Sequence, residues 1–219
     1  MTPRQRFEGA AAWVPEGGGL RAVARALEEC RGCDLWADAL QAVPGRGPAG
    51  ADLVLVGEQP GDVEDQQGEA FVGPAGGLLD EALEAAGIDA DTVYLTNAVK
   101  HFRHEGTRGK RRIHKSPSRS HVLACEPWLD TELERIRPRG VVVLGATAAS
   151  ALLGPGFKVT QDRGHVLDWP QNHPLQHEPD WVVATVHPSA VLRSEDRHSA
   201  FAGLVDDLAA ARARLGADG

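Results

Sequence analysis

Residues 53–62 read LVLVGEQPGD, so that a short run of apolar residues ends in glycine and gives way to a polar segment. A run of Val and Leu without alternation is typical of a strand that is buried on both faces of a parallel sheet. Three later runs have the same character, at residues 93–97 (VYLTN), 141–145 (VVVLG) and 181–186 (WVVATV). The sequence therefore predicts a central sheet of four parallel strands.

Helical patterns separate the predicted strands, over residues 76–86, 118–137 and 146–153. A further pattern, over 200–215, brings to one face Phe201, Leu204, Val205, Leu208, Ala211 and Leu215. Strands that alternate with helices predict a three-layer α/β/α fold. We also expect a small hairpin over residues 157–169 that turns at 161–164.

The composition is that of a single globular domain. The chain has 219 residues, of which 42% are apolar and 25% charged. We expect one domain over residues 19–216 and a disordered segment over 1–18. The first twenty residues hold no sustained apolar stretch, and the most apolar run, residues 141–154, is interrupted by polar residues. We therefore expect no membrane association and a cytoplasmic location.

Positive charge is concentrated in one segment of an otherwise acidic chain. The formal net charge is −8, yet residues 100–119 hold eight Lys or Arg residues and a single acid, Glu105. A local basic patch attracts polyanions whatever the total charge is. From charge alone, a nucleic-acid contact and a solvated disordered loop fit this segment equally well.

The three cysteines point to a metal rather than to disulfides. Cys30 and Cys33 have the two-residue gap that lets two thiolates reach one metal. A redox pair is expected to follow a strand and open a helix, whereas this pair follows a helical stretch at residues 20–29. Cys125 is a candidate third thiol, and the candidates for a fourth ligand are His101, His104 and a ligand from solvent. Their spacing fits zinc and an iron–sulfur cluster equally well.

Polar side chains follow three of the predicted strands, at the edge where ligands bind in open α/β sheets. After the first strand, the carboxylates of Glu58, Asp62 and Asp65 suit the stabilisation of positive charge on a sugar ring or the uptake of a proton. Glu58 would repel a phosphate, and the Gly-Lys-Ser/Thr of a phosphate-binding loop is absent. Solvated carboxylates in a turn are the simpler alternative for each acid.

Other strand-end residues suit the recognition of a flat, polar ligand. Phe71 is a candidate stacking platform or a core residue, and Asn97 offers a donor and an acceptor to a pyrimidine edge or caps a turn. His187 can donate to an oxygen that gains charge as a base leaves. Leu192 or Val191 can insert into a base stack, as enzymes that extrude a base require.

These motifs resemble those of the family 4 uracil-DNA glycosylases, in register from about residue 30 to residue 207. The matching segments are Gly57-Glu-Gln-Pro-Gly61, Phe71-Val-Gly73, Asn97-Ala-Val-Lys100, Gly145-Ala-Thr147 and His187-Pro-Ser189. The insertion that contains Lys110-Arg-Arg-Ile-His114 is similar to that of the subgroup called UdgX. The fold implied is that of a uracil-DNA glycosylase.

The resemblance implies roles for individual residues. It implies a structural [4Fe–4S] cluster held by Cys30, Cys33, His101 and Cys125. Uracil would be bound by Gln59, Asp65, Phe71 and Asn97, with His187 stabilising the departing base. The residues implied to contact DNA, with single strands preferred, are Lys110, Arg111, Arg112, Lys115, Ser189, Leu192 and Arg193.

In the UdgX subgroup, a loop histidine attacks C1′ of the sugar and stays attached to DNA. The resemblance gives this role to His114, supported by Glu58, and implies a single turnover. We also expect Asp62 to be a catalytic residue and the protein to act as a monomer, which is all that extrusion of a base requires. The surrounding cations should favour a neutral, nucleophilic imidazole. Two alternatives remain open: a conventional glycosylase that hydrolyses the bond and leaves an abasic site, and a non-catalytic zinc module that binds nucleic acid.

Overall fold

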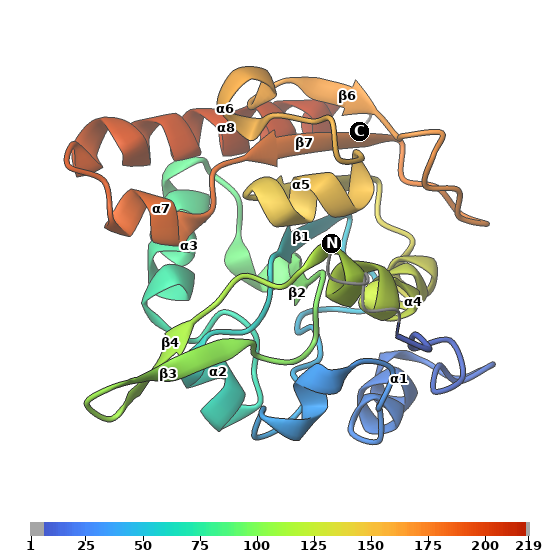
Figure 1. The fold of residues 1–219 in the computed structure, drawn as a ribbon. Helices are drawn as coiled ribbons and strands as arrows, with labels where there is room; N and C mark the ends of the chain where they lie inside the picture. Colours follow the sequence, from blue (N-terminus) through green and yellow to red (C-terminus); the bar gives the residue numbers. More distant parts are fainter. Residues whose placement is uncertain (1–6, 218–219) are drawn as a thin grey trace.

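A sheet of five strands lies at the centre of the fold in the computed structural model, which describes residues 7–217 (Figure 1). The strand order is β2-β1-β5-β7-β6. The first four strands run parallel, with bounds Tyr94–Asn97, Leu53–Gly57, Gly140–Leu144 and Trp181–Thr185. All their residues are buried, which explains why the sequence shows apolar runs instead of alternation. The predicted parallel sheet is confirmed.

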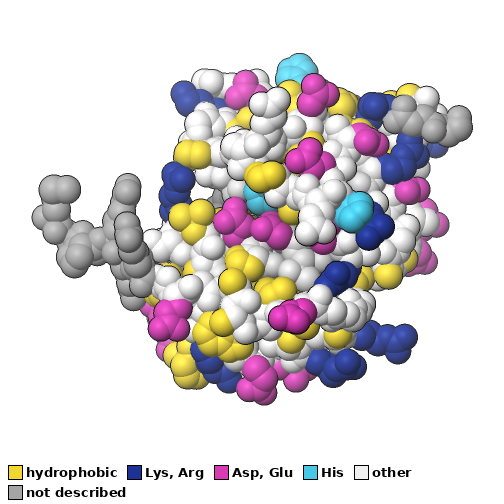
Figure 2. Space-filling model, turned by 90° about the vertical axis from the view of Figure 1, so that its right-hand side faces the viewer, with side chains coloured by type: hydrophobic (Ala, Val, Ile, Leu, Met, Phe, Trp, Pro, Cys, Tyr) yellow, Lys and Arg dark blue, Asp and Glu magenta, His cyan; other side chains and the backbone are white. Residues whose placement is uncertain are grey.

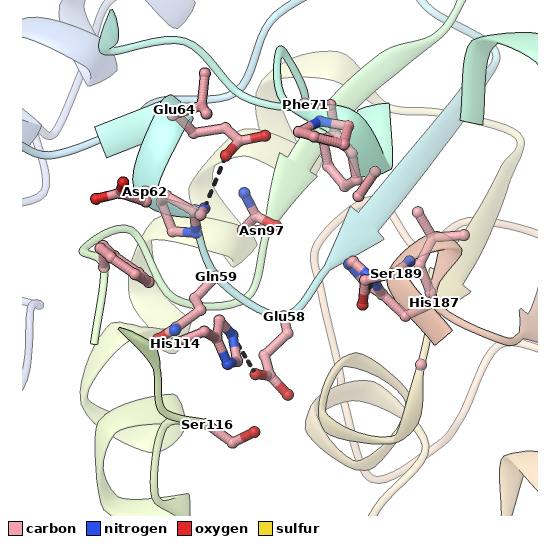
Figure 3. Close-up of a pocket in the computed structure, with 18 of the residues that line it drawn as sticks. Glu58, Gln59, Asp62, Glu64, Phe71, Asn97, His114, Ser116, His187 and Ser189 are labelled. Carbon is pink, nitrogen blue, oxygen red and sulfur yellow. Dashed lines mark hydrogen bonds and ion pairs between the residues drawn. The ribbon is translucent and has the colours of Figure 1, made fainter. Parts of the chain in front are cut away.

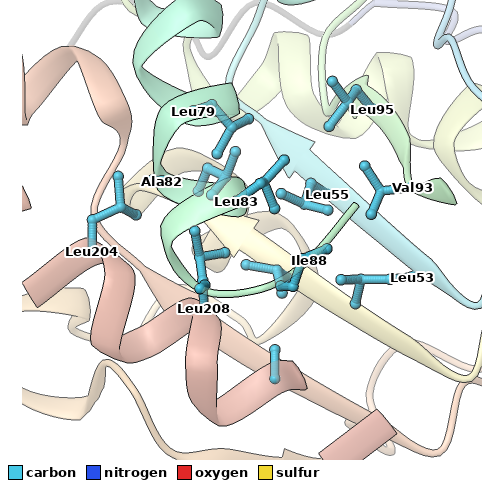
Figure 4. Close-up of a cluster of buried hydrophobic side chains, with 14 of the residues drawn as sticks. Leu53, Leu55, Leu79, Ala82, Leu83, Ile88, Val93, Leu95, Leu204 and Leu208 are labelled. Atoms are coloured by element: carbon cyan, nitrogen blue, oxygen red, sulfur yellow. The ribbon is translucent and has the colours of Figure 1, made fainter. Parts of the chain in front are cut away.

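Three helices cover one face of the sheet: α3 (Pro74–Ala85), α7 (Pro188–Leu192) and α8 (Arg197–Ala217). Alternate residues of each strand point to this side. Figure 4 shows the resulting cluster, in which the strand residues Leu53, Leu55 and Leu95 meet Leu79, Leu83, Leu204 and Leu208 of the helices.

The opposite face is covered by α4 (Arg119–Ile136), α5 (Ala146–Leu152) and α6 (Val159–Asp162). Val54 and Val143, which alternate with the residues of the first face, pack there against Leu129 and Leu133 of α4. The two clusters on either side of one sheet confirm the predicted three-layer architecture.

The fifth strand corrects the predicted hairpin over residues 157–169. The first part of this stretch forms α6, and β6 (Val166–Asp168) pairs antiparallel with β7 instead of with its own neighbour. Residues 166–168 pair with β7 because β7 would otherwise be an unpaired strand at the edge of the sheet. The sheet therefore has five strands rather than four.

A hairpin does occur, but in the basic segment. Strands β3 (His104–Arg108) and β4 (Arg111–His114) form a separate two-stranded sheet that projects beside α2 (Asp62–Gln67) (Figure 1). His114 is the last residue of β4. The basic segment is thus neither a simple loop nor disordered, because its two halves pair with each other.

The N-terminal part packs on the body of the protein. Helix α1 (Leu20–Leu27) and the short 3₁₀ helix Asp34–Ala37 lie against α4, and another 3₁₀ helix, Ala90–Thr92, precedes β2. The backbone N–H groups of Gly9 and Ala10 donate to the carbonyl oxygens of Gly32 and Ala124. The predicted disordered segment is therefore corrected for these residues, while residues 1–6 lie outside the described part.

The loop 169–180 is fastened to α4 by two histidines. The Nε2 atom of His173 lies 2.9 Å from Oδ1 of Asp130, and Nδ1 of His177 lies 3.0 Å from Oε2 of Glu134. Figure 2 shows the side of the molecule where this loop and α4 lie, with acidic and basic side chains interspersed. No helix among residues 7–217 is both long enough and apolar enough to cross a membrane.

Candidate active site

A pocket of about 800 Å³ opens at the carboxyl ends of the parallel strands, within the size range of ligand sites (Figure 3). Glu58 follows β1, Asn97 ends β2 and His187 follows β7, as the position of ligand sites in such sheets predicts. The predicted site residues that line it are Glu58, Gln59, Asp62, Phe71, Asn97, Arg111, Arg112, His114, His187, Ser189, Leu192 and Arg193.

His114 and Glu58 form a pair at the rim of this pocket. Nε2 of His114 lies 3.2 Å from Oε1 of Glu58, and the histidine side chain is about half exposed whereas that of the glutamate is 19% exposed. The hydroxyl of Thr147 donates to the other carboxylate oxygen, Oε2. Burial opposes the ionisation of Glu58, but the hydrogen bonds from His114 and Thr147 hold its pKa below the usual value. Glu58 is therefore a carboxylate at neutral pH.

His187 faces the pocket as a neutral imidazole. Its Nδ1 accepts a hydrogen bond from the backbone N–H of Ser189, at 3.1 Å, as the N-cap of α7. The ring proton consequently lies on Nε2, which can donate into the pocket. Burial lowers the pKa of His187 to about 4, so the ring stays neutral at physiological pH. A neutral imidazole can stabilise developing negative charge, as in other enzymes.

Phe71 and Asn97 form the inner wall. Phe71 has a φ of +56°, and its backbone is braced by Arg46, whose Nε donates to the carbonyl oxygen of Ala70 at 2.6 Å. The centroid of the Phe71 ring lies 6.4 Å from that of His187, with the planes 26° apart. The Asn97 side chain is buried, and its amide makes no hydrogen bond to any residue of the described chain.

Gly57 lies beneath both residues. A Cβ atom at this position would come 2.7 Å from Cζ of Phe71 and would also clash with Oδ1 of Asn97. Only glycine lets the strand, the phenyl ring and the amide approach this closely. The glycine at the end of β1 thus shapes the floor of the pocket.

Arg112 was predicted to contact DNA, but its guanidinium is bound within the protein. Its Nε lies 2.6 Å from Oδ1 of Asp62, and its Nη1 lies 2.6 Å from Oδ2 of Asp65. The Asp65 carboxylate is fully buried, also accepts from the N–H of Leu40, and does not line the pocket. The side chains predicted to contact DNA and uracil are therefore paired with each other, and this pair joins β4 to α2.

Gln59 was predicted to bind uracil, and its side chain is likewise occupied. Its Nε2 donates to the carbonyl oxygens of Arg103 and Lys115, at 3.0 and 3.2 Å, and its Oε1 accepts from the N–H of Arg103. The amide thus closes the base of the β3–β4 hairpin. Gln59 thus lines the pocket, while its side-chain amide supports the hairpin.

The remaining cations lie at or beyond the rim. Arg111 lines the pocket, whereas Lys110 is exposed at the turn between β3 and β4 and lies outside the pocket lining. Lys115 forms an ion pair with Glu105 on the surface of the hairpin. Two of the residues predicted to contact DNA, Lys110 and Arg111, are therefore exposed at the hairpin tip.

Sequence reasoning missed several pocket residues, including Glu64, Phe102 and Thr147. Glu64 accepts hydrogen bonds from the backbone N–H groups of Gly61 and Gly73 and so joins two loops of the pocket. Thr147 follows β5 and so lies at the carboxyl end of a parallel strand, as Glu58, Asn97 and His187 do. The same strand-end rule therefore predicts it from the sequence.

The three cysteines lie in one cluster, in which Cys30 and Cys125 are buried and Cys33 is partly buried. Burial raises the pKa of the Cys33 thiol to about 11 and that of Cys125 to about 12. The N–H of Lys100 donates to Sγ of Cys125, and Nε1 of Trp128 donates to Sγ of Cys30. His101 is buried, and burial lowers its pKa to about 4. Within residues 7–217, no group of His, Cys, Asp and Glu side chains is arranged to hold a single metal ion.

The fold agrees with comparisons to known proteins. Residues 44–209 match the family model of the uracil DNA glycosylase superfamily. The type-4 uracil-DNA glycosylase of Sulfurisphaera tokodaii is 32% identical over 178 residues, 79% of this chain and 76% of that protein. That of Thermotoga maritima is 34% identical over 176 residues, 80% and 84% of the two chains.

The chain therefore belongs to the type-4 uracil-DNA glycosylases of this superfamily. The family implied by the motifs is confirmed. The UdgX subgroup stays a prediction.

Proposed function

We propose that this protein excises uracil from DNA and that His114 then captures the sugar, which leaves the protein covalently attached to the DNA. The pairing of His114 with the ionised Glu58, at 3.2 Å, is the observation that carries this proposal. The pair lies at the rim of a pocket whose inner wall holds Phe71, Asn97 and His187.

The inner wall suits an extruded pyrimidine. An enzyme that acts on a base must first take it out of the stack and read its edge by hydrogen bonds. The buried amide of Asn97 offers a donor and an acceptor and has no partner among the described residues. The ring of Phe71 provides a flat surface for stacking. These two residues support uracil as the base that is bound.

His187 assists the departure of the base. When the bond between N1 of uracil and C1′ breaks, the electron pair stays with uracil and the sugar becomes cationic. The Nε2–H of the neutral His187 donates to a uracil oxygen that gains negative charge. The Glu58 carboxylate, which also lines the pocket, stabilises the cationic sugar.

His114 then supplies the nucleophile. The ring nitrogen that carries a lone pair forms a bond to C1′, and the proton on the other nitrogen is shared with or passes to Glu58. The bond that forms is an N-glycosidic bond to imidazole, and nothing regenerates the free histidine. One molecule of protein therefore processes one uracil.

The rim suits contact with DNA around the extruded nucleotide. Arg111, Ser189 and Arg193 line the mouth of the pocket, together with the apolar side chain of Leu192. Lys110 extends this surface at the hairpin tip, and Lys115 lies on the hairpin near its base. We expect a preference for single-stranded DNA, in which extrusion costs less, and action as a monomer in the cytoplasm.

The donor set fits an iron–sulfur cluster. Cys30, Cys33, Cys125 and His101 would hold a [4Fe–4S] cluster, and the N–H groups that point at two of the sulfurs are typical of such sites. These four residues come from the segment after α1, from α4 and from the end of β2, so a bound cluster would link these three parts of the chain. The role proposed for it is structural.

The decisive experiment incubates the protein with uracil-containing single-stranded DNA and resolves the products on a denaturing gel. We expect an adduct that survives heat and detergent, that is absent with a thymine-containing control and that is lost in His114→Ala. Uracil release with an alkali-labile site and no adduct would overturn covalent capture in favour of a hydrolytic glycosylase. A colourless zinc protein that binds both DNAs equally would favour a non-catalytic module.

A further inference from the structure

The two oxygens of the Glu58 carboxylate have different partners. Oε1 faces His114, and Oε2 accepts a hydrogen bond from the hydroxyl of Thr147. Figure 3 shows Glu58 with its carboxylate directed toward His114, which comes from the hairpin. Thr147 comes from the first turn of α5, on the side of the pocket formed by the body of the protein.

We propose that Thr147 is a positioning residue that fixes the orientation of the Glu58 carboxylate, so that Oε1 faces His114. The inference rests on the proposed function, since it concerns the residue that assists His114. Glu58 has several rotatable bonds and is only partly buried, and without a second anchor its carboxylate can turn away from the imidazole. The hydrogen bond from the Thr147 hydroxyl restricts this rotation of the Glu58 carboxylate.

The surroundings of Thr147 support a polar role over a packing role. The buried residues of α5 are Ala148, Ala149 and Leu152, whereas Thr147 is half-buried and lines the pocket. A pocket-lining hydroxyl that donates to a carboxylate is a charge-assisted hydrogen bond, stronger than one between neutral groups. Its loss would affect the site more than the core.

The same contact influences the ionisation of Glu58. The titratable groups that face this carboxylate are His114 from β4 and His187 from the N-cap of α7, with the hydroxyls of Thr147 and Ser116 as uncharged donors. The hydrogen bond from Thr147 lowers the pKa of Glu58 and so extends the pH range over which the carboxylate is ionised.

The test compares Thr147→Val, which replaces the hydroxyl with a methyl group, with Thr147→Ser, which keeps it. The rate of adduct formation with uracil-containing single-stranded DNA is measured under single-turnover conditions from pH 4 to pH 8. We expect the valine variant to be slower by about tenfold or more at pH 7, from the usual strength of a hydrogen bond to a charged group. The acidic limb of its pH–rate profile should move to higher pH. The rate of the serine variant should stay within about twofold of the wild-type rate.

A valine variant with the wild-type rate and acidic limb would overturn the proposal, and so would a serine variant as slow as the valine one. Thermal unfolding shows whether each variant is folded. Should Thr147→Val be unstable, Thr147→Ala removes the hydroxyl without added bulk. In that variant the ¹³C titration of the Glu58 carboxyl must show a higher pKa than in wild type, and an unchanged pKa would also overturn the proposal.

Failure of the proposed function is distinguishable from failure of this inference. If the wild-type protein releases uracil without forming an adduct, covalent capture is wrong. The role of Thr147 is then tested by the acidic limb of uracil release, because the same carboxylate would orient the attacking water. A wild-type-like limb in Thr147→Val would contradict the positioning role in either case.

Discussion

The guanidinium of Arg112 lies 2.6 Å from the carboxylate of Asp65, which is fully buried, and this ion pair fastens the strand that carries His114 to α2. This ion pair holds the basic β3–β4 hairpin against the rest of the domain. The position of the proposed nucleophile depends on a contact between residues 47 positions apart in the sequence.

Replacing Arg112 with Gln should destabilise the protein and misplace His114. The substitution leaves the Asp65 carboxylate buried without its cation, a change that typically costs about 3 kcal/mol or more. Urea denaturation should show this loss, and adduct formation should slow more than DNA binding weakens. The matched control is the exposed neighbour Arg111→Gln, which should keep the stability of wild type; equal stability of the two variants would contradict the role of Arg112.

Replacing His114 with Ser should convert capture into hydrolysis. The smaller side chain leaves room for a water molecule beside Glu58, and water can then attack the sugar in place of the imidazole. We expect released uracil and an alkali-labile site, with several turnovers per protein molecule. An inert and correctly folded His114→Ser protein would show that the site does not admit water in this way.

Replacing Gly57 with Ala should abolish recognition of uracil. The added Cβ would lie 2.7 Å from Cζ of Phe71 and would clash with the Asn97 amide, so the inner wall must shift. Overpacking of this kind typically costs about 1–3 kcal/mol. Uracil excision and thermal unfolding measure the two effects. Gly50→Ala, where nothing lies within 4 Å of the new atom, is the control and should behave as wild type.

Stability should fall between pH 6.5 and pH 4 because His187 is held neutral. Its pKa is about 4 in the folded protein and 6.5 in the unfolded chain, so near pH 5 the unfolded state binds about one more proton. The free energy of unfolding therefore rises with pH across this window. In His187→Gln, the slope of the free energy of unfolding against pH should decrease by the equivalent of about one proton near pH 5. Denaturant titrations at several pH values measure this slope, and an unchanged slope would contradict a buried neutral imidazole.

Removal of either exposed cation at the hairpin tip should lower the salt dependence of DNA binding. Each phosphate contact on single-stranded DNA contributes about 0.7 to the slope of log affinity against log salt. Lys110→Gln and Arg111→Gln should each lower the slope by roughly that amount, measured by fluorescence anisotropy. Arg21→Gln, on the exposed side of α1 and outside the pocket lining, should leave the slope unchanged.

The sequence by itself determined the sheet and much of the pocket. Strands β1, β2, β5 and β7 are apolar throughout because both their faces are covered, and this composition is visible without coordinates. Glu58, Asn97 and His187 followed from the rule that ligands bind at the carboxyl ends of parallel strands. The same rule, applied to β5, would have added Thr147.

Tertiary structure alone decided which polar side chains are free to act. Gln59, Asp65 and Arg112 resemble binding residues in the sequence, yet their partners are Arg103, Lys115, Leu40 and Asp62, which come from other parts of the chain. The β3–β4 hairpin and strand β6 were missed because their apolar patterns are weak and their pairing depends on neighbouring segments. Apolar burial leaves a local pattern along the chain, whereas the partner of a hydrogen bond is set by distance in space, which only the folded chain defines.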